Sequence, residues 1–340
     1  MAHEFPIKDI AFQAGLSTAT VDRVINKRGG VRRRTEARVR AALTELERQE
    51  DGLAASGRKL AIDIVMEAPD RFNGEVRAAF ESEAAAFFPV TFRSRFHFSE
   101  IAPHAALAST LNRIRLRGSH GVVVKAPDAP LINAAVDGLE AAGIPVAALV
   151  TDLPRARRTA YAGMDNHAAG ATAAYIIGKY LGDAPGEVLV TLSSSGFRGE
   201  GERGAGFRHA ISNRFPNLAI VEISEGFGRD DVTGSLAAAA LQKHQRINAV
   251  YSIGGGNRAV LAAFEALGRS CKVYVAHDLD EENRALLAQG KLTFVLHHDL
   301  KADIRSIFKV FLDHHKIQPM GGARGVSAME IITPFNLPKR

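Results

Sequence analysis

Apolar strand-like runs alternate with helical patterns over most of the chain, and this alternation constrains the fold more than any other feature. The segments between the runs are rich in Ala and Leu at helical spacing, as in Ala129 to Ala142 and Asn166 to Leu181. A repeated strand and helix predicts an α/β fold, with parallel sheets covered by helices on both faces. The nine runs are Leu60 to Met66, Val90 to Phe96, Gly121 to Val124, Pro145 to Leu149, Glu187 to Leu192, Leu218 to Ile223, Ala249 to Ser252, Val273 to His277 and Phe294 to His297.

Nine strands exceed what one small sheet usually holds, so residues 60–340 are expected to form two lobes. The polar, irregular stretch from Thr151 to Asn166 falls midway and favours chain crossings between them. Ligands of open α/β sheets bind beyond the carboxyl ends of the strands, which predicts a cleft there. The predicted lobes are 60–162 with 294–322, and 163–293 with 323–340.

The first 48 residues predict three short helices around one small core. The first helix ends at Gly15, Ser17 caps a second helix from Thr18 to Asn26, and Thr35 opens a third. Two helices joined by a short Gly-containing turn, the second polar on its outer side, are typical of a helix-turn-helix unit. The apolar positions at helical spacing are Ile7, Ile10, Ala11, Ala14, Val21, Val24, Ile25, Val39, Ala42, Leu43 and Leu46.

Positive charge is concentrated between Arg23 and Arg40, where eight Lys and Arg side chains stand against the single carboxylate of Glu36. The whole chain of 340 residues carries only +6. A basic cluster beside a helix-turn-helix favours contact with the DNA backbone, although a solvated helix face is the alternative interpretation.

The words IKDIAFQAGLSTATVDRVINKRGGV, within residues 7–46, resemble the opening of lac-repressor-type transcriptional regulators, the LacI family. The resemblance implies that Thr18, Ala19 and Arg23 read bases and that Ser17 and Asn26 touch phosphates. Family members commonly have Ser where this chain has Asp22. Because a carboxylate repels phosphate, we expect Asp22 to orient a neighbouring arginine instead.

Residues 49–59 form the predicted linker, and here the chain departs from the family. The Tyr-x-Pro-Asn segment that precedes the family's hinge helix is absent. Leu53 is the one candidate for the leucine that wedges into the minor groove, and a plain flexible linker is the alternative.

The segment from residue 60 to 340 resembles the type I periplasmic sugar-binding fold that LacI-family regulators use to bind effectors. Words such as AlaGlyMetAspAsn (162–166) and AlaHisAsp (276–278) carry the resemblance. Post-strand carboxylates and arginines pair with sugar hydroxyls, and aromatic rings stack on sugar C–H faces. Ser252 and Asn257 are alternatives for the one ligand contact that the family has after the strand ending at Ser252. The candidate effector contacts are Phe72, Asn73, Asp152, Arg203, Phe227, Ser252, Asn257, Asp278 and His298.

Several of these residues also have purely structural interpretations. Asp152 and Asp278 could cap helices, and Arg203 could pair with Glu200 or Glu202. His298 beside His297 has no third ligand at a recognisable spacing, so no metal is expected.

Two other classes compete with a regulator. An NAD-dependent oxidoreductase would use Gly199-x-Gly201-x-x-Gly204, although six residues separate this motif from the preceding strand. A free sugar-binding protein of a transporter would share the fold, but the N-terminal unit and the lack of a secretory signal argue against it.

Composition narrows the class further. With one cysteine, Cys271, neither an internal disulfide nor a cysteine-rich zinc site can form, and no apolar run approaches the roughly 20 residues of a membrane span. We expect a cytoplasmic, non-enzymatic homodimer without a cofactor or a membrane partner. It would bind a roughly palindromic DNA operator, acting as a repressor controlled by a carbohydrate-like effector.

Overall fold

The computed structural model describes residues 5–55, 57–317 and 326–338, and side chains within these ranges except 48–55. Three helices come first: α1 (Ile7–Ala14), α2 (Thr18–Ile25) and α3 (Arg33–Ala55). They enclose a small core that includes Ile10, Val21 and Val39. The structure confirms the three predicted helices.

Two details of the head differ from the prediction. Helix α3 begins at Arg33, two residues before Thr35, because the carbonyl of Arg32 accepts the first-turn amides of Thr35 and Glu36. The helix also continues to Ala55, through most of the predicted linker 49–59. Leu53 lies on this helical backbone, but its side chain is outside the described part, so its wedge role stays a prediction.

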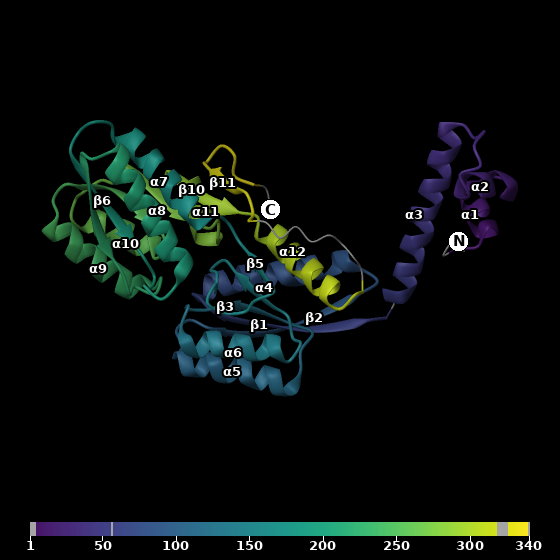
Figure 1. Ribbon diagram of the computed structural model, residues 1–340. Coiled ribbons are helices and arrows are strands. Elements are labelled where there is room, and N and C mark those ends of the chain that lie inside the picture. The colour runs from purple at the N-terminus through teal and green to yellow at the C-terminus, as the bar shows by residue number, and fades with distance from the viewer. Residues whose placement is uncertain (1–4, 56, 318–325, 339–340) are drawn as a thin grey trace.

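The first lobe is a parallel sheet of five strands in the order β2-β1-β3-β4-β5. Helices α4 and α12 cover one face, and α5 and α6 cover the other (Figure 1). Its elements are β1 (Lys59–Glu67), α4 (Asp70–Ala84), η1 (Ala85–Phe87), β2 (Thr91–Ser99), α5 (His104–Arg117), β3 (Gly121–Lys125), α6 (Pro130–Ala141), β4 (Val146–Leu149), β5 (Ala160–Ala162) and α12 (Leu300–His314).

The second lobe is a sheet of six strands in the order β11-β10-β9-β8-β6-β7, in which only β11 runs antiparallel. Helices α7 and α8 pack on one face and α9, α10 and α11 on the other. Its elements are α7 (Asn166–Leu181), β6 (Gly186–Thr191), α8 (Arg198–Arg214), β7 (Leu218–Ile223), α9 (Asp230–Lys243), β8 (Ile247–Ser252), α10 (Asn257–Ala266), β9 (Val273–His277), α11 (Glu281–Ala288), β10 (Phe294–His298) and β11 (Met329–Ile332).

All nine predicted strands form, and the two-lobed α/β architecture is as expected. One predicted boundary is displaced: the sequence pattern places residues 294–298 in the first lobe, but β10 pairs with β9 in the second sheet. The chain crosses back only after His298, because α12 buries Ile304 and Phe308 against the first lobe. Residues at the carboxyl ends of strands from both sheets line one cavity, so these ends face each other across a cleft.

Candidate functional site

The N-terminal head presents the exposed side of α2. The turn before it depends on Gly15, which ends α1 with φ 59°, a left-handed conformation that glycine adopts without strain. Ser17 then caps α2, its Oγ accepting from the amide of Thr20 at 3.2 Å. Arg38 of α3 donates to the carbonyl of Ala14 at 2.7 Å and fixes the third helix against the turn.

All five described candidates for DNA contact lie on the exposed surface of this unit: Ser17, Thr18, Ala19, Arg23 and Asn26. Asp22 accepts from Asn26 at 2.7 Å and from Arg28 at 2.8 Å. The arginine that Asp22 was expected to orient is therefore Arg28, in the basic loop after α2. The same contact holds the amide of Asn26, a predicted phosphate ligand.

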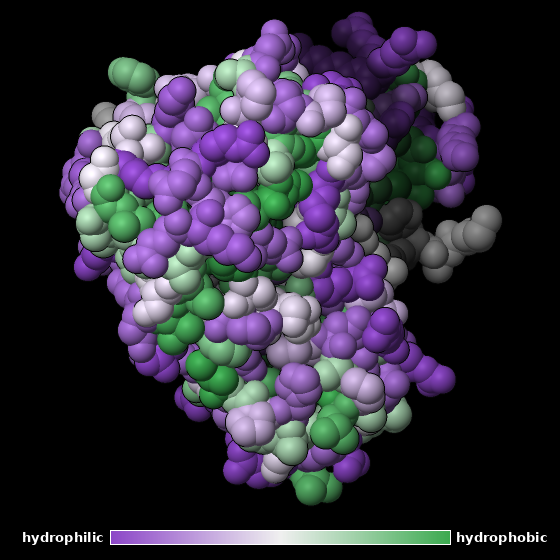
Figure 2. All heavy atoms as spheres, turned by 90° about the vertical axis from the view of Figure 1, so that its left-hand side faces the viewer, coloured by the Kyte–Doolittle hydropathy of each residue, from purple (hydrophilic) through white to green (hydrophobic). Residues whose placement is uncertain are grey.

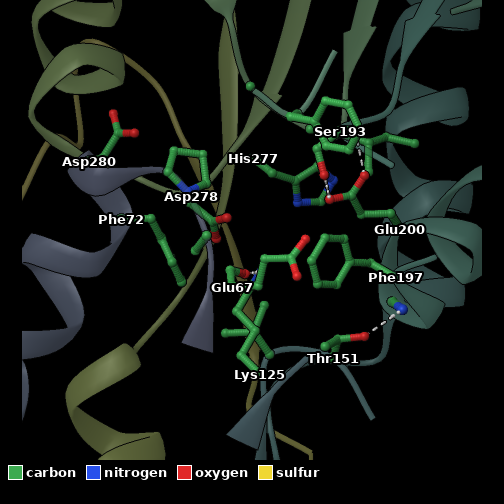
Figure 3. A pocket seen from close by; sticks show the side chains of 18 of the residues that line it. Glu67, Phe72, Lys125, Thr151, Ser193, Phe197, Glu200, His277, Asp278 and Asp280 are labelled. Carbon is green, nitrogen blue, oxygen red and sulfur yellow. Dashed lines mark hydrogen bonds between the residues drawn. The ribbon is translucent and has the colours of Figure 1, made fainter. Parts of the chain in front are cut away.

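The second candidate site is a cavity between the two lobes. Its cavity volume is about 80 Å³, and it is partly open to solvent. The first lobe supplies residues at the ends of β1, β2 and β3 and at the start of α4, and the second supplies the loops after β6, β7, β8 and β9. Figure 3 shows Glu67 and Lys125 lying between the rings of Phe72 and Phe197.

Four of the nine predicted effector residues line this cavity: Phe72, Arg203, Phe227 and Asp278. Arg203 is 3% exposed, and its Nε donates to Asn166 at 2.8 Å, so it does not pair with the surface carboxylates of its own helix. The backbone is in the left-handed region at both Asp278, with φ 63°, and Phe227, with φ 51°.

The other five residues do not line the cavity, because each side chain is used by the fold. Asn73 donates to the carbonyl of Ala68. Asp152 forms a two-point ion pair with Arg158. Ser252 accepts from Thr191, and Asn257 bonds to Asn283 and Tyr274.

His298 does not line the cavity but lines the groove that adjoins it. Its Nδ1 is 2.6 Å from Asp303, and its Nε2 is 3.7 Å from Asp278. Neither Ser252 nor Asn257 lines the cavity. Ile253, Gly254 and Gly255 form the wall in that part of the second lobe.

Sequence reasoning missed several lining residues, above all Glu67 and Lys125. Both stand directly after predicted strands, so the post-strand rule that selected Asp278 also reaches them. Glu200 and Ser193 form another missed pair, in which the carboxylate accepts from both the amide and the hydroxyl of Ser193. Other missed lining residues include Arg71, Glu100, Thr151, Phe197, His277, Asp280 and Asn283.

Lys125 is the central cation of the cavity. Its Nζ donates to the carbonyl of Glu67 at 2.9 Å and lies 4.2 Å from the ring centre of Phe197. Burial lowers the pKa of this lysine, while the carboxylates of Glu200, Glu67 and Asp278 oppose that shift. Burial also raises the pKa of Glu67, which Lys125 opposes.

His277 presents a neutral imidazole to the cavity. Burial, with Arg203 and His298 nearby, lowers its pKa well below the usual value. Its Nε2 is 2.8 Å from the hydroxyl of Tyr251, and its Nδ1 has no hydrogen-bond partner in the described part of the chain.

Direct contacts join the lobes around the cavity. Arg71 of α4 donates to Asp280 at 3.0 Å and to the carbonyl of Gly228 at 3.1 Å. Thr151 of the first lobe accepts from the amide of Gly199 at 3.0 Å. The lobes therefore lie closed against each other.

The glycine motif that suggested a dinucleotide site does not lie where such a site needs it. Gly199, Gly201 and Gly204 lie within α8 and not in a strand-to-helix turn. Farther along, a Cβ on Gly206 would come 2.1 Å from the carbonyl of His167 in α7. Gly206, which lies outside the motif, therefore serves the close packing of α8 on α7.

Together the fold and the site define a two-lobed ligand-binding protein that carries a helix-turn-helix head. The family model described as "Periplasmic binding protein domain" matches residues 64–314, and "Bacterial regulatory proteins, lacI family" matches residues 6–48. The chain belongs to the periplasmic binding protein domain family, and its head is a lacI-family DNA-binding domain. It is accordingly a DNA-binding transcriptional regulator of the LacI type.

Solved structures share the fold at low sequence identity. GanP, a glucose-galactose binding protein from Geobacillus stearothermophilus, is 19% identical, with a TM-score of 0.72 over 83% of this chain and 100% of that one. A protein from Bacteroides fragilis described as a LacI transcriptional regulator is 15% identical, with a TM-score of 0.68 over 82% of this chain and 98% of that one. No curated protein matches the sequence significantly.

Among the described residues, no helix is both long and apolar enough to cross a membrane. Hydrophilic residues predominate on the face of the molecule seen in Figure 2, and the hydrophobic ones there form several separate groups.

Proposed function

We propose that this regulator is a homodimeric repressor that binds a roughly palindromic operator and responds to a sugar-like effector in the cavity. The observation that carries the proposal is the presence, on one chain, of an exposed recognition helix and a cavity between the lobes lined by carboxylates, two guanidinium groups and three phenylalanine rings. A protein that acts on chromosomal DNA would work in the cytoplasm. Several structural neighbours are described as sugar-binding proteins, including a fructose-binding periplasmic domain and a solute-binding protein with D-allose, which supports this ligand class.

A dimer is proposed because one recognition helix makes too few base contacts for a specific site, and paired heads read two half-sites across a two-fold axis. Selection of bound duplexes from a random pool should enrich a palindrome. Absence of any enriched sequence would contradict the proposal.

Arg23→Ala tests the assignment of the recognition helix. Arg23 is exposed near the end of α2, and its loss should weaken operator binding by about 1–3 kcal/mol and relax the preference at one base position. The matched control is Arg40→Ala, in a side chain whose partner is Glu36 within α3. It should weaken binding less and leave base preference unchanged, as measured by titration on the enriched duplex and its single-base variants.

Asp278→Ala tests the coupling of the two sites. The variant should lose the effector response and keep operator affinity, because the head has its own core. Coupling is reciprocal, so the operator should also change effector affinity in the parent protein. An unchanged effector response in the variant would remove Asp278 from the site.

A further inference from the structure

The cavity continues into an open groove between α4 and the edge of the second lobe, and the two share Phe72, Asp278 and Asp280. Although the chain is basic overall, the described residues that line this combined cleft include nine carboxylates against five cationic side chains. The carboxylates are those of Glu67, Glu75, Glu100, Glu200, Asp278, Asp280, Glu281, Asp299 and Glu330. The cations are Arg71, Lys125, Arg203, Arg284 and Lys301.

Two of the three cationic side chains that line the cavity already interact with other groups of the protein. Arg71 is held by Asp280 and the carbonyl of Gly228. Lys125 is held by the carbonyl of Glu67 and the ring of Phe197. Lys125 thus acts as an internal counter-ion for the carboxylates around it, and Arg203 is left to donate to a ligand from its terminal nitrogens.

Some buried hydrogen-bond acceptors around the cavity, in contrast, have no donor within the described part of the chain. Glu67 is 5% exposed, and its Oε2 has no hydrogen-bond partner in the described part of the chain. The same holds for Oδ1 of Asp278, and Nδ1 of His277 also lacks a partner, as a donor or an acceptor according to the tautomer of the ring. A buried acceptor without a donor is costly, so a ligand that brings several donors gains affinity here.

We propose that the effector is an uncharged sugar or sugar alcohol, and that the cleft rejects sugar acids and sugar phosphates. Hydroxyl groups donate to Glu67 and Asp278, accept from Arg203 and pair in either direction with His277, while the phenylalanine rings cover the C–H faces. A carboxylate or phosphate would place a further negative charge among carboxylates whose counter-ions are already engaged. This inference rests on the proposed sugar-responsive function and narrows its ligand class.

Matched ligand sets test the proposal on the full-length protein: glucose with glucuronate and glucose 6-phosphate, galactose with galacturonate, and ribose with ribose 5-phosphate. Thermal shift would identify the sets that bind, and calorimetry would give the dissociation constants. In each binding set the uncharged member should bind at least about tenfold more tightly. High salt should narrow that ratio, because it screens the repulsion of the anionic members.

A second experiment reverses the charge of carboxylates that line the groove. Glu75→Lys and Glu330→Lys replace exposed carboxylates beside the cavity, so each should reduce the ratio between uncharged and anionic members several-fold. The control is Asp183→Lys, an exposed side chain in the turn before β6 at the opposite ends of the strands, which should leave the ratio unchanged.

An acid or phosphate that binds as tightly as its uncharged parent would overturn the proposal and leave sugar-responsive regulation standing. The proposal is overturned in the same way if Asp183→Lys changes the ratio as much as the groove variants do. If no member of any set binds, the proposed sugar effector fails, and this inference fails with it.

Discussion

Asp63 in β1 is fully buried and is held ionised by its hydrogen-bonding neighbours. Its carboxylate accepts from Arg95 at 2.6 Å and from Arg117 at 2.6 Å, and it lies 2.8 Å from Nε2 of His97. Burial by itself would raise the pKa of Asp63, but hydrogen bonds from His97, Ser119 and the two arginines lower it to about 2. The charge therefore stabilises the fold above the ordinary carboxyl pKa of 3.8, and that stabilisation is lost as the pH falls toward 2.

Asp63→Asn should lower the free energy of unfolding at pH 7 by about 2–4 kcal/mol, because it leaves a buried cluster without its anion while the arginines keep some access to water. Urea unfolding at pH 7 and pH 3 would measure the effect, which should shrink in acid. Arg117→Met is the control: this side chain is 47% exposed, so its loss should cost less than about 1 kcal/mol. An equal loss for Asp63→Asn at both pH values would contradict the assignment.

Single residues also show where prediction of the site from sequence stops. The post-strand rule locates Asp278 and Phe227, and it would have located Lys125. It cannot tell which post-strand side chains turn inward, because that depends on backbone conformations such as the positive φ of Asp278 and on competing partners. Asn257 follows a strand in the same way but is held by Tyr274 and Asn283.

At the scale of elements, the strands were predictable because buried parallel strands are continuous apolar runs. Strands β5 and β11 were missed because they have only three and four residues and lack such a run. The displaced lobe boundary has a similar cause: β10 and α12 are adjacent in sequence, and tertiary packing alone assigns them to different lobes.

The contact of α7 with α8 depends on glycine at two close approaches. A Cβ on Gly170 would come 1.9 Å from the carbonyl of Arg203, and one on Gly206 would come 2.1 Å from the carbonyl of His167. Backbone atoms cannot move aside as a flexible side chain would.

Gly206→Ala should therefore separate the two helices and lower the free energy of unfolding by about 1–3 kcal/mol. Effector affinity should fall as well, because Arg203 lies one turn earlier on α8. Gly201→Ala in the same helix meets nothing within 4 Å and should leave stability unchanged or raise it by up to about 1 kcal/mol. Thermal unfolding and calorimetric titration of both variants would measure these effects. Equal effects of the two substitutions would refute the packing argument.

At the scale of the whole molecule, the closed arrangement of the lobes depends on Arg71. Its guanidinium spans from α4 to Asp280 and to the carbonyl of Gly228 in the second lobe. Asp280 also caps α11 by accepting from the amide of Asn283 at 2.8 Å, so the anion at the far end of the bridge is fixed in place. An effector that closes the cleft would therefore bind more tightly when this bridge favours the closed state.

Arg71→Ala should shift the lobes toward an open state and weaken effector binding by about tenfold, since a hydrogen bond to a charged group contributes about 1.5–3 kcal/mol and this arginine is 29% exposed. Small-angle scattering without effector should show a larger radius of gyration than that of the parent protein. Because Arg71 also lines the cavity, Asp280→Asn is the matched test of the bridge. If the arginine acts through the bridge, the second substitution should add little to the first in a double-mutant cycle. Fully additive losses, with an unchanged radius in both variants, would show that Arg71 acts by contact with the effector and not by holding the lobes together.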